Sequence, residues 1–336
     1  MESTMAKYAK RIERNEVDPH VQYGRERSGL ILDPHREEVP LEILGFGIYQ
    51  LSSGPITRET GSHEIVLVPQ EGEFEAEVSG KKFSGRRDGG PFSPGPGKSN
   101  ASAIYIPCNA RLQIRGKGEI AFFEAPAFKE KPPFYLPSQE VKVVTRGKYT
   151  WRRDVASLIS PKDASTNLVV GETWSPPGLW SGTPLHQHDK DDRVSGESDY
   201  EEIYYHRFNW KKKAGDEFGP YGVQLLMDGK GLTKSYVIGE KSIFAIPGGC
   251  HPVVASPVSE LLYLWGLAGS GGELMMRDIP EFAYLKSFEA IFITLEAEGK
   301  IIPGHRLETI CAPYSFTEEQ GRLLKVMLLE MGYRIE

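Results

Sequence analysis

Short apolar runs bounded by glycine and proline recur along most of the chain. They are rich in β-branched and aromatic residues, and runs of this kind are typical of strands. The runs predict strands at residues 63–70, 74–80, 101–107, 120–126, 141–147, 167–174, 201–208, 222–228, 234–239, 242–248, 251–257 and 260–269. Long amphipathic helices between strands, which indicate a parallel sheet, are absent from this pattern. The sequence therefore predicts an all-β protein, built as a sandwich or a barrel.

The predicted strands form two groups, separated by the proline-rich segment "APAFKEKPPFYLPSQ". Each group contains a strand that ends in "IP" and a later strand that ends near "AP" or "AG", which is a faint sign of internal duplication. We therefore predict an N-terminal barrel over residues 28–128, a C-terminal barrel over 150–290 and a C-terminal extension over 291–336.

The end of the chain has a helical pattern instead. In "SFTEEQGRLLKVMLLEMGYRIE", Ser315 stands three residues before Glu318, as in a capping box, and apolar residues follow at helical spacing. Gly332 can end this helix. We expect its apolar face to pack on the barrel or on another subunit, and we expect a homo-oligomer.

Composition and charge exclude several classes of partner. The 336 residues include 40 Lys and Arg against 46 Asp and Glu, a net charge of −6, with no dominant basic stripe, so nucleic acid is not expected. No apolar run reaches the ~18 residues of a membrane span, and residues 1–20 lack the apolar core of a secretory signal. Three distant cysteines suit a reduced protein. We therefore expect a cytoplasmic location and no membrane partner.

The segment "GTPLHQHDKDD" carries the first chemical signal. His186 and His188 are two positions apart, so in a strand they share one face. The later segment "IPGGCHPVVA" places His251 after a Pro-Gly turn. Between them, "YEEIYYHR" is strongly β by composition and supplies a carboxylate. Three imidazoles and one carboxylate from neighbouring strands suit a divalent ion such as zinc, manganese, iron, nickel or cobalt.

Strand alternation decides which carboxylate belongs to this set. One face of the strand carries Glu202, Tyr204 and His206, and the other carries Glu201, Ile203, Tyr205 and Arg207. An inward Glu202 places a ligand, a phenol and an imidazole on one face. Taken alone, the segment also fits an exposed edge strand with Glu202 in an ordinary ion pair. The two histidine motifs favour the metal-site interpretation.

The two-histidine motif, a later Glu and a Pro-Gly turn before a third His resemble the metal site of cupins. The segments "NLVVGETWSPPGLWSGTPLHQHD", "EEIYYHRF" and "IPGGCHPVVASP", with 13 residues between His188 and Glu202, closely resemble the 5-deoxy-glucuronate isomerases of inositol catabolism. Members of that family are two-cupin proteins, and "GRRDGGPFSPGPGKSNASAIYIP" resembles their metal-free N-terminal cupin. The chain departs from the family at Leu185, His206 and Cys250, and in its helical tail.

The resemblance implies a bicupin of two jelly-roll barrels and an aldose–ketose isomerisation of 5-deoxy-glucuronate, a small-molecule sugar acid, to 2-deoxy-5-keto-gluconate. It also implies one divalent ion, zinc or manganese, in the C-terminal barrel alone. The expected ligands are His186, His188, Glu202 and His251. A metal stabilises the developing enediolate, and the protein must move one proton.

Residues for proton transfer and substrate binding follow from their positions. Tyr204 and His206 are the candidates for proton transfer, because they share the ligand face; an equal alternative for His206 is that it orients a ligand. Gln224 and Trp180, with Trp174, are candidates for lining the cavity, although a barrel Trp is more often plain core. Because the substrate is an anion, Lys190 and Arg193 are candidate cations at the mouth, on a segment that is either a flap or a solvated loop.

Three other functions compete with this interpretation. A 4-deoxy-5-keto-uronate ketol-isomerase of pectin breakdown has a similar architecture, but spaces its ligands more closely. A cupin dioxygenase has the same ligand set and consumes O2. A non-catalytic bicupin would bind a sugar acid without turnover.

Overall fold

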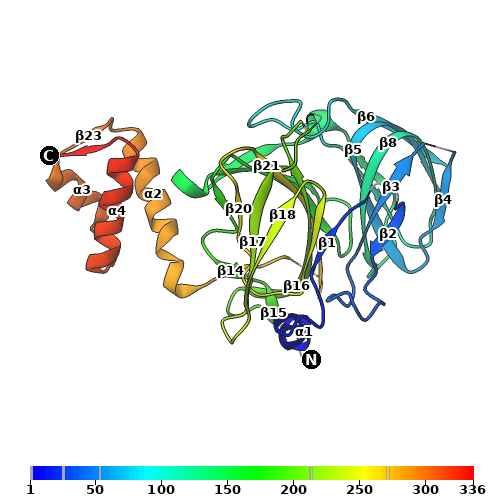
Figure 1. Ribbon diagram of the computed structural model, residues 1–336, viewed down its shortest axis with the longest axis horizontal. Helices are drawn as coiled ribbons and strands as arrows, with labels where there is room; N and C mark the ends of the chain where they lie inside the picture. The colour runs from blue at the N-terminus through cyan, green and yellow to red at the C-terminus, as the bar shows by residue number, and fades with distance from the viewer. Residues whose placement is uncertain are drawn as a thin grey trace.

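The computed structural model describes residues 3–24, 27–52, 54–211, 213, 215–269, 271 and 273–336. Strands, almost all of them antiparallel, are the main regular secondary structure in this part of the chain, which confirms the all-β prediction. Figure 1 shows two strand-rich units side by side, with a small helical unit on the far side of one of them. None of the helices in the described ranges is both long and apolar enough to cross a membrane.

The N-terminal unit is one curled antiparallel sheet. Its strands are β2 (Gly29–Leu32), β3 (Gly45–Leu51), β4 (Ile56–Glu59), β5 (His63–Val78), β6 (Lys81–Arg87), β7 (Ala103–Ile106), β8 (Arg111–Pro126) and β9 (Phe134–Leu136). The long strands β5 and β8 pair along their length, and each changes its second partner midway, from β7 to β6 and from β4 to β3. The sheet thereby closes around an interior filled with apolar side chains, including Leu67, Leu112 and Phe122.

The C-terminal unit consists mainly of two facing sheets. The larger sheet contains β1 (His20–Gln22), β10 (Val143–Arg146), β11 (Arg153–Ile159), β12 (Val169–Ser175), β15 (Asp189–Asp192), β16 (Glu197–Phe208), β19 (Ser242–Ile246) and β21 (Leu261–Gly269). The smaller sheet contains β13 (Trp180–Ser181), β17 (Tyr221–Met227), β18 (Thr233–Gly239) and β20 (Val253–Ala255). The two-residue strands β14 (His186–Gln187) and β22 (Arg277–Asp278) pair separately. Apolar residues of the larger sheet and of the smaller sheet meet inside the barrel.

The first residues of the chain belong with the C-terminal barrel rather than the N-terminal one. Helix α1 (Thr4–Glu13) packs Met5, Tyr8 and Ile12 against the barrel's apolar interior, and β1 pairs with β19. In Figure 1 this helix lies beneath the C-terminal barrel, close to β15. The pattern of apolar runs in the sequence did not predict this helix. The domain boundaries 28–128, 150–290 and 291–336 remain predictions.

A shared core joins the two barrels. Residues from both sheets meet there, among them Phe123 from β8 and Ile203 and Tyr205 from β16. The approach is close, because a Cβ added at Gly266 would lie 2.3 Å from the Phe123 ring. The predicted linker contributes as well, since it carries β9, which pairs with β7.

The C-terminal extension has three helices where the sequence predicted one. These are α2 (Tyr284–Glu296), α3 (Gly304–Cys311) and α4 (Glu318–Glu330), with a small parallel pair formed by β23 (Ile301–Ile302) and β24 (Arg334–Ile335). The predicted helix is α4, and Gly332 ends it with a positive φ of 83°. The capping box is formed by Thr317 and Gln320, two residues later than the predicted Ser315 and Glu318.

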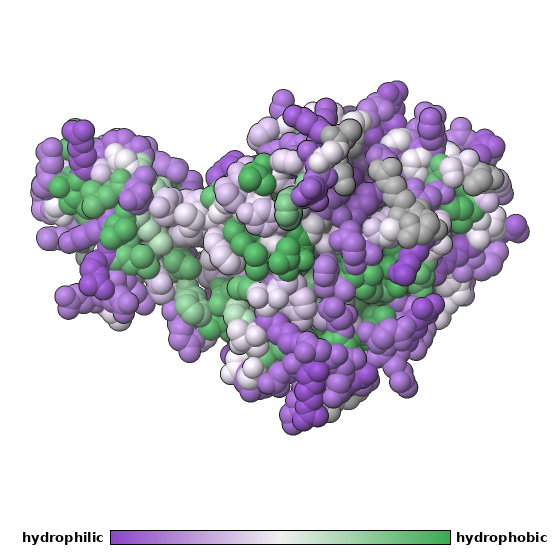
Figure 2. All heavy atoms as spheres, viewed as in Figure 1, coloured by the Kyte–Doolittle hydropathy of each residue, from purple (hydrophilic) through white to green (hydrophobic). Residues whose placement is uncertain are grey.

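The extension has an apolar core that also includes barrel residues. Phe288, Phe292 and Leu328 are fully buried in it, and Trp151 packs against them from the short 3-10 helix η2 (Tyr149–Trp151). Figure 2 shows apolar surface across the extension and at its junction with the barrel. Two further 3-10 turns are η1 (Ser138–Glu140) and η3 (Pro280–Phe282).

Candidate metal centre and active site

Three of the four predicted metal ligands meet inside the C-terminal barrel. One ligand atom from each of His188, Glu202 and His251 lies within 4.8 Å of the other two. The Oε2 atom of Glu202 is 3.3 Å from Nε2 of His188 and 3.0 Å from Nε2 of His251. All three side chains are buried. They come from the loop after β14, from β16 and from the turn before β20, segments that are distant in sequence.

The hydrogen bonds of the histidines prepare them to bind a cation. The Nδ1 atom of His188 lies 3.0 Å from the Tyr200 carbonyl, and that of His251 lies 2.8 Å from the Gly249 carbonyl. A carbonyl accepts only from an N–H, so Nδ1 carries the proton and Nε2 presents a lone pair. Both Nε2 atoms are buried without a hydrogen bond of acceptable geometry. Two orphaned lone pairs beside one carboxylate oxygen fit a divalent cation.

The charge state of the carboxylate supports this fit. Burial alone opposes ionisation of Glu202, but His188 and His251, when their rings are protonated, outweigh burial through hydrogen bonds and charge and lower its pKa to about 2. Glu202 is therefore ionised at neutral pH. The adjacent Glu201 points to the opposite side, where it accepts a hydrogen bond from the Glu42 backbone N–H at 2.7 Å and another from Thr4 Oγ1 at 3.0 Å. Strand alternation thus separates the two carboxylates as the sequence predicted.

The fourth predicted ligand, His186, stands beside the cluster and is half-buried. Its ring centroid is 5.8 Å from that of His251, and its Nδ1 lies 2.9 Å from the Pro184 carbonyl. Burial, followed by the neighbouring His251, lowers its pKa to about 4, so the ring is neutral. His186 has the same fixed tautomer as the other two histidines, and its position at the edge of the cluster leaves it partly open to solvent.

The 13-residue insertion between ligands is a β-hairpin rather than an open loop. Strand β15 pairs with the first residues of β16, with Asp189 opposite Asp199. Glu197, which is buried, accepts from the Asp189 backbone N–H at 3.1 Å and pairs with Arg277 at 2.8 Å. Arg277 lies on β22, which pairs with β14, the strand that carries His186. This contact therefore ties the hairpin to the segment that leads into the extension.

The two candidates for proton transfer lie on the ligand face of β16. The Tyr204 ring contacts the ring of His251 at a centroid distance of 5.8 Å and that of His206 at 5.9 Å. Tyr204 therefore stands beside the cluster, with His206 on its other side. Burial lowers the pKa of His206 to about 3, although the Ser242 carbonyl and Gln224 favour the charged ring. A free imidazole has a pKa of about 6.5, and the fully buried position of His206 is the reason for the difference.

The four predicted substrate-binding residues have different surroundings. Gln224 is buried and donates to the His251 carbonyl at 2.8 Å, so it supports the turn that carries a ligand. Trp180 packs with the core of the extension. Lys190 is exposed beside a groove along α1, and Arg193 donates to the carbonyls of residues 271 and 273. The structure does not bring these last three side chains to the cluster, and their substrate contacts remain predictions.

The candidate lining residue Trp174 faces the other barrel, where its Nε1 donates to the Pro91 carbonyl at 3.2 Å. The sequence analysis missed a different residue, Arg153, at the start of β11. Pairing across β11, β12, β21 and β16 puts Thr173, Tyr263 and His206 on one inner face. Arg153 shares this face by alternation with Val155, the partner of Thr173. The two-residue alternation along β11 does not by itself show which face of this strand is inside the barrel.

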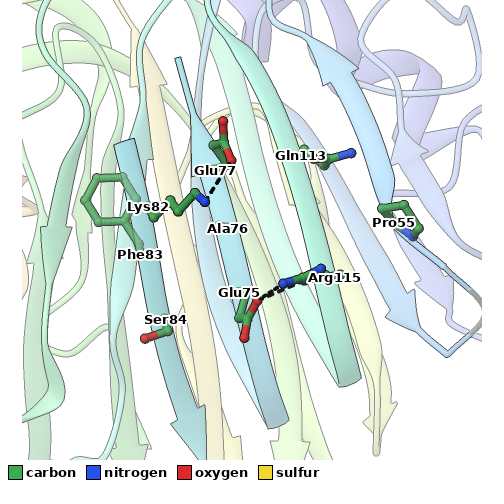
Figure 3. Close-up of a pocket in the computed structure, with 9 residues that line it drawn as sticks. All are labelled: Pro55, Glu75, Ala76, Glu77, Lys82, Phe83, Ser84, Gln113 and Arg115. Carbon is green, nitrogen blue, oxygen red and sulfur yellow. Dashed lines mark hydrogen bonds and ion pairs between the residues drawn. The ribbon is translucent and has the colours of Figure 1, made fainter. Parts of the chain in front are cut away.

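A cavity of about 500 Å³ lies on the N-terminal barrel (Figure 3). Residues of β5, β6 and β8 line it, and the ion pairs Glu75–Arg115 and Glu77–Lys82 cross it. Histidine is absent from this lining, so it offers no imidazole ligand. The prediction that this barrel holds no metal remains a prediction.

The chain is similar to known proteins over most of its length. The sequence profile of the KduI/IolB family matches residues 19–285. A 5-deoxy-glucuronate isomerase of Geobacillus kaustophilus is 30% identical over 239 residues, which cover 69% of this chain and 82% of the relative. The 5-deoxy-glucuronate isomerase of Bacillus subtilis is 26% identical over 235 residues, covering 68% and 82%.

Solved structures show the same architecture. An IolB-like protein from Salmonella typhimurium aligns with a TM-score of 0.70 and 25% identity, covering 80% of this chain and 98% of that one. Oxalate decarboxylase of Bacillus subtilis, a protein with Mn(II) centres, aligns with a TM-score of 0.54 and 10% identity, covering 92% and 86%. These alignments confirm the two-barrel cupin fold. Most of the helical extension lies beyond the residues that the family profile matches.

Proposed function

Since the chain belongs to the KduI/IolB family and its curated relatives are isomerases, we propose that it converts 5-deoxy-glucuronate to 2-deoxy-5-keto-gluconate. The observation that carries the proposal is the buried cluster of His188, Glu202 and His251, with two Nε2 lone pairs directed beside one carboxylate. Such a site suits an aldose–ketose isomerase, because negative charge develops on neighbouring oxygens of its substrate during the reaction and a bound cation stabilises that charge.

The residues that would hold a divalent metal, zinc or manganese, are these three together with His186. Bound there, the metal would supply a Lewis acid for the carbonyl and hydroxyl oxygens of the sugar. Imidazole nitrogens and a carboxylate are suitable ligands for either ion. The backbone carbonyls that accept from each Nδ1 keep the rings in the orientation and tautomer that ligation requires.

The reaction removes a proton from the carbon next to the aldehyde and returns one to the aldehyde carbon. Tyr204 is the proposed residue for holding a proton at a substrate oxygen, because its ring lies directly beside His251 and a phenol is protonated at neutral pH. His206 also contacts the Tyr204 ring, at a centroid distance of 5.9 Å, and is assigned a positioning role. Tyr263 also packs on Tyr204, at a centroid distance of 4.4 Å, and limits the movement of its ring.

The test is turnover by the metal-loaded protein of 5-deoxy-glucuronate and of 4-deoxy-5-keto-uronate, followed side by side by NMR. Metal content is measured by mass spectrometry, and oxygen consumption with an electrode. The proposal expects turnover of the first sugar, little of the second, and no oxygen uptake. Preference for the second sugar would support the pectin ketol-isomerase, oxygen uptake the dioxygenase, and binding without turnover the non-catalytic bicupin.

A further inference from the structure

The inner face of the C-terminal barrel carries a cation that lacks an acidic partner. Arg153 is half-buried, and in the described part of the chain no carboxylate forms an ion pair with its guanidinium. Its neighbour Arg152, by contrast, pairs with Asp154 at 3.3 Å. Charges inside proteins are normally paired, so an inward guanidinium without a carboxylate is a candidate site for an anionic ligand.

Backbone contacts hold Arg153 beside the candidate metal site. Its Nη1 donates to the carbonyls of Trp151 and Thr183, at 3.1 Å each. The next carbonyl along the chain, that of Pro184, accepts from Nδ1 of His186. Arg153 and His186 are therefore fixed by adjacent peptide groups, and both keep some exposed surface whereas His188, Glu202 and His251 are buried.

The aromatic side chains next to the metal ligands lie within the field of this cation. The charge of Arg153 acts to lower the pKa of Tyr204 and of Tyr263, although burial raises both pKa values more strongly. Tyr204 contacts His251, and Arg153 is held close to the cluster through the Thr183 carbonyl, which is next to the Pro184 carbonyl that accepts from His186. Nη1 is used by the two carbonyls, and the remaining donors of the guanidinium fork have no acidic partner among the described residues.

We propose that Arg153 binds the carboxylate of the sugar acid and sets the preference of the site for an acid over a neutral aldose. This assignment rests on the proposed function, in which the aldehyde end of the substrate occupies the metal cluster and the carboxylate lies at the opposite end of the molecule. A guanidinium donates two parallel hydrogen bonds to a carboxylate, which a lysine ammonium does not reproduce.

The test compares wild type with Arg153→Met and Arg153→Lys, each loaded with metal. The matched control is Arg152→Met, which removes the adjacent exposed arginine. The kcat and KM are measured for 5-deoxy-glucuronate and for the corresponding neutral 5-deoxy-aldose, which has CH2OH in place of the carboxylate. Calorimetry measures the dissociation constants of D-glucuronate and D-glucose, so that binding is followed independently of turnover. Metal content and Tm are recorded for every variant.

Arg153→Met should raise KM for the acid by about 10- to 100-fold, the range for losing a hydrogen bond to a charged group. The same variant should change KM for the neutral sugar by less than about threefold, because only the carboxylate contact is lost. Arg153→Lys should recover part of the loss, and Arg152→Met none of these effects. If the two sugars weaken equally, or the preference for the acid persists, Arg153 does not bind the carboxylate.

The calorimetry separates this inference from the proposed function. Wild-type protein that fails to isomerise 5-deoxy-glucuronate, but prefers D-glucuronate over D-glucose through Arg153, would refute the isomerase and retain the assignment of Arg153. Wild-type protein that turns over the acid while Arg153→Met keeps the full preference would support the isomerase and refute the assignment of Arg153. No binding of either acid by wild-type protein would overturn the assignment of Arg153.

Discussion

At the scale of single residues, the candidate centre depends on which nitrogen of each histidine carries the proton. A backbone carbonyl accepts from Nδ1 of His186, His188 and His251, so all three rings present Nε2 to the barrel interior. The ionised Glu202 supplies the charge that a cation requires. This arrangement explains why burying three imidazoles and a carboxylate together is tolerable in this fold, since a metal can satisfy them all.

Replacing Glu202 with Gln should abolish stoichiometric metal binding, because it removes the anionic ligand and leaves only neutral donors. Mass spectrometry after dialysis should find one divalent ion per chain in wild type and a small fraction of that in Glu202→Gln. His206→Phe is the control and should keep its metal, since His206 lies beyond Tyr204. Full retention of metal by Glu202→Gln would contradict the ligand set, and two metals per wild-type chain would contradict the prediction of a metal-free N-terminal barrel.

His206 should make the stability of the protein depend on pH in a defined direction. The unfolded chain binds a proton at this imidazole below a pH of about 6.5. In the folded chain His206 binds this proton only when the pH falls to about 3, the pKa of the buried ring. The unfolded state therefore binds more protons between these values, and the free energy of unfolding of wild type falls as the pH drops through this window.

Phenylalanine cannot bind that proton, so His206→Phe should lose less stability than wild type on acidification. Urea unfolding of both proteins at pH 7 and pH 5 measures this difference, which is up to about 1.4 kcal/mol per pH unit. The same variant should lower kcat through the misplaced Tyr204 ring without removing a pH dependence near neutrality. Equal acid sensitivity of the two proteins would show that His206 is charged in the folded state.

Much of this site could be predicted from local periodicity, and the rest could not. The two-residue period of β16 placed Glu202, Tyr204 and His206 on one face, because alternation is a local property of a strand. Arg153 was missed because the inner face of β11 depends on its pairing with β12 and, through β12, on β21, which both follow it in the chain. The surroundings of Trp180 likewise depend on the extension, whose position relative to the barrel no local pattern specifies.

At the scale of elements, the C-terminal extension likewise has one helix that local sequence signals predict and two that they do not. Helix α4 was predictable from its apolar spacing and from Gly332, both of which are local signals. Helices α2 and α3 have no side-chain N-cap, and α3 has only 8 residues, so their stability comes from a shared core that sequence spacing does not reveal. Helix α1 was missed for a related reason, since its partner surface is a barrel formed from residues far along the chain.

Two neighbouring residues of α2 provide a matched test of that core. Phe292 is fully buried against Trp151, whereas Ile293 is 57% exposed. Phe292→Ala should destabilise the extension by about 3–5 kcal/mol, the usual cost of removing a buried aromatic side chain. Ile293→Ala should change stability by less than about 0.5 kcal/mol. Limited trypsin digestion should cut the first variant faster at Lys300 and Arg306. Equal cutting of both variants would mean that the extension is not held by this core.

At the scale of the whole molecule, the two barrels are joined by buried polar contacts as well as by the apolar core. Glu119 of β8 accepts from Tyr205 of β16 at 2.8 Å and also pairs with Lys241. Arg87 of β6 donates to both carboxylate oxygens of Glu172 of β12, at 2.6 and 2.8 Å. The N-terminal barrel thereby supports β12, a strand of the sheet that also contains the Glu202 strand β16.

The Arg87–Glu172 pair has no side-chain exposure, so breaking it should be costly and should affect both barrels. Arg87→Met leaves a buried carboxylate without its partner and should lower the free energy of unfolding by about 3–5 kcal/mol. The double variant Arg87→Met/Glu172→Leu removes the stranded charge and should recover most of that loss. Arg115→Met removes the exposed pair with Glu75 on the same barrel and should cost less than about 1 kcal/mol. Urea unfolding of the four proteins gives the comparison. If the double variant is as unstable as Arg87→Met, the unpaired carboxylate of Glu172 is not the cause of the loss and the pair does not join the barrels.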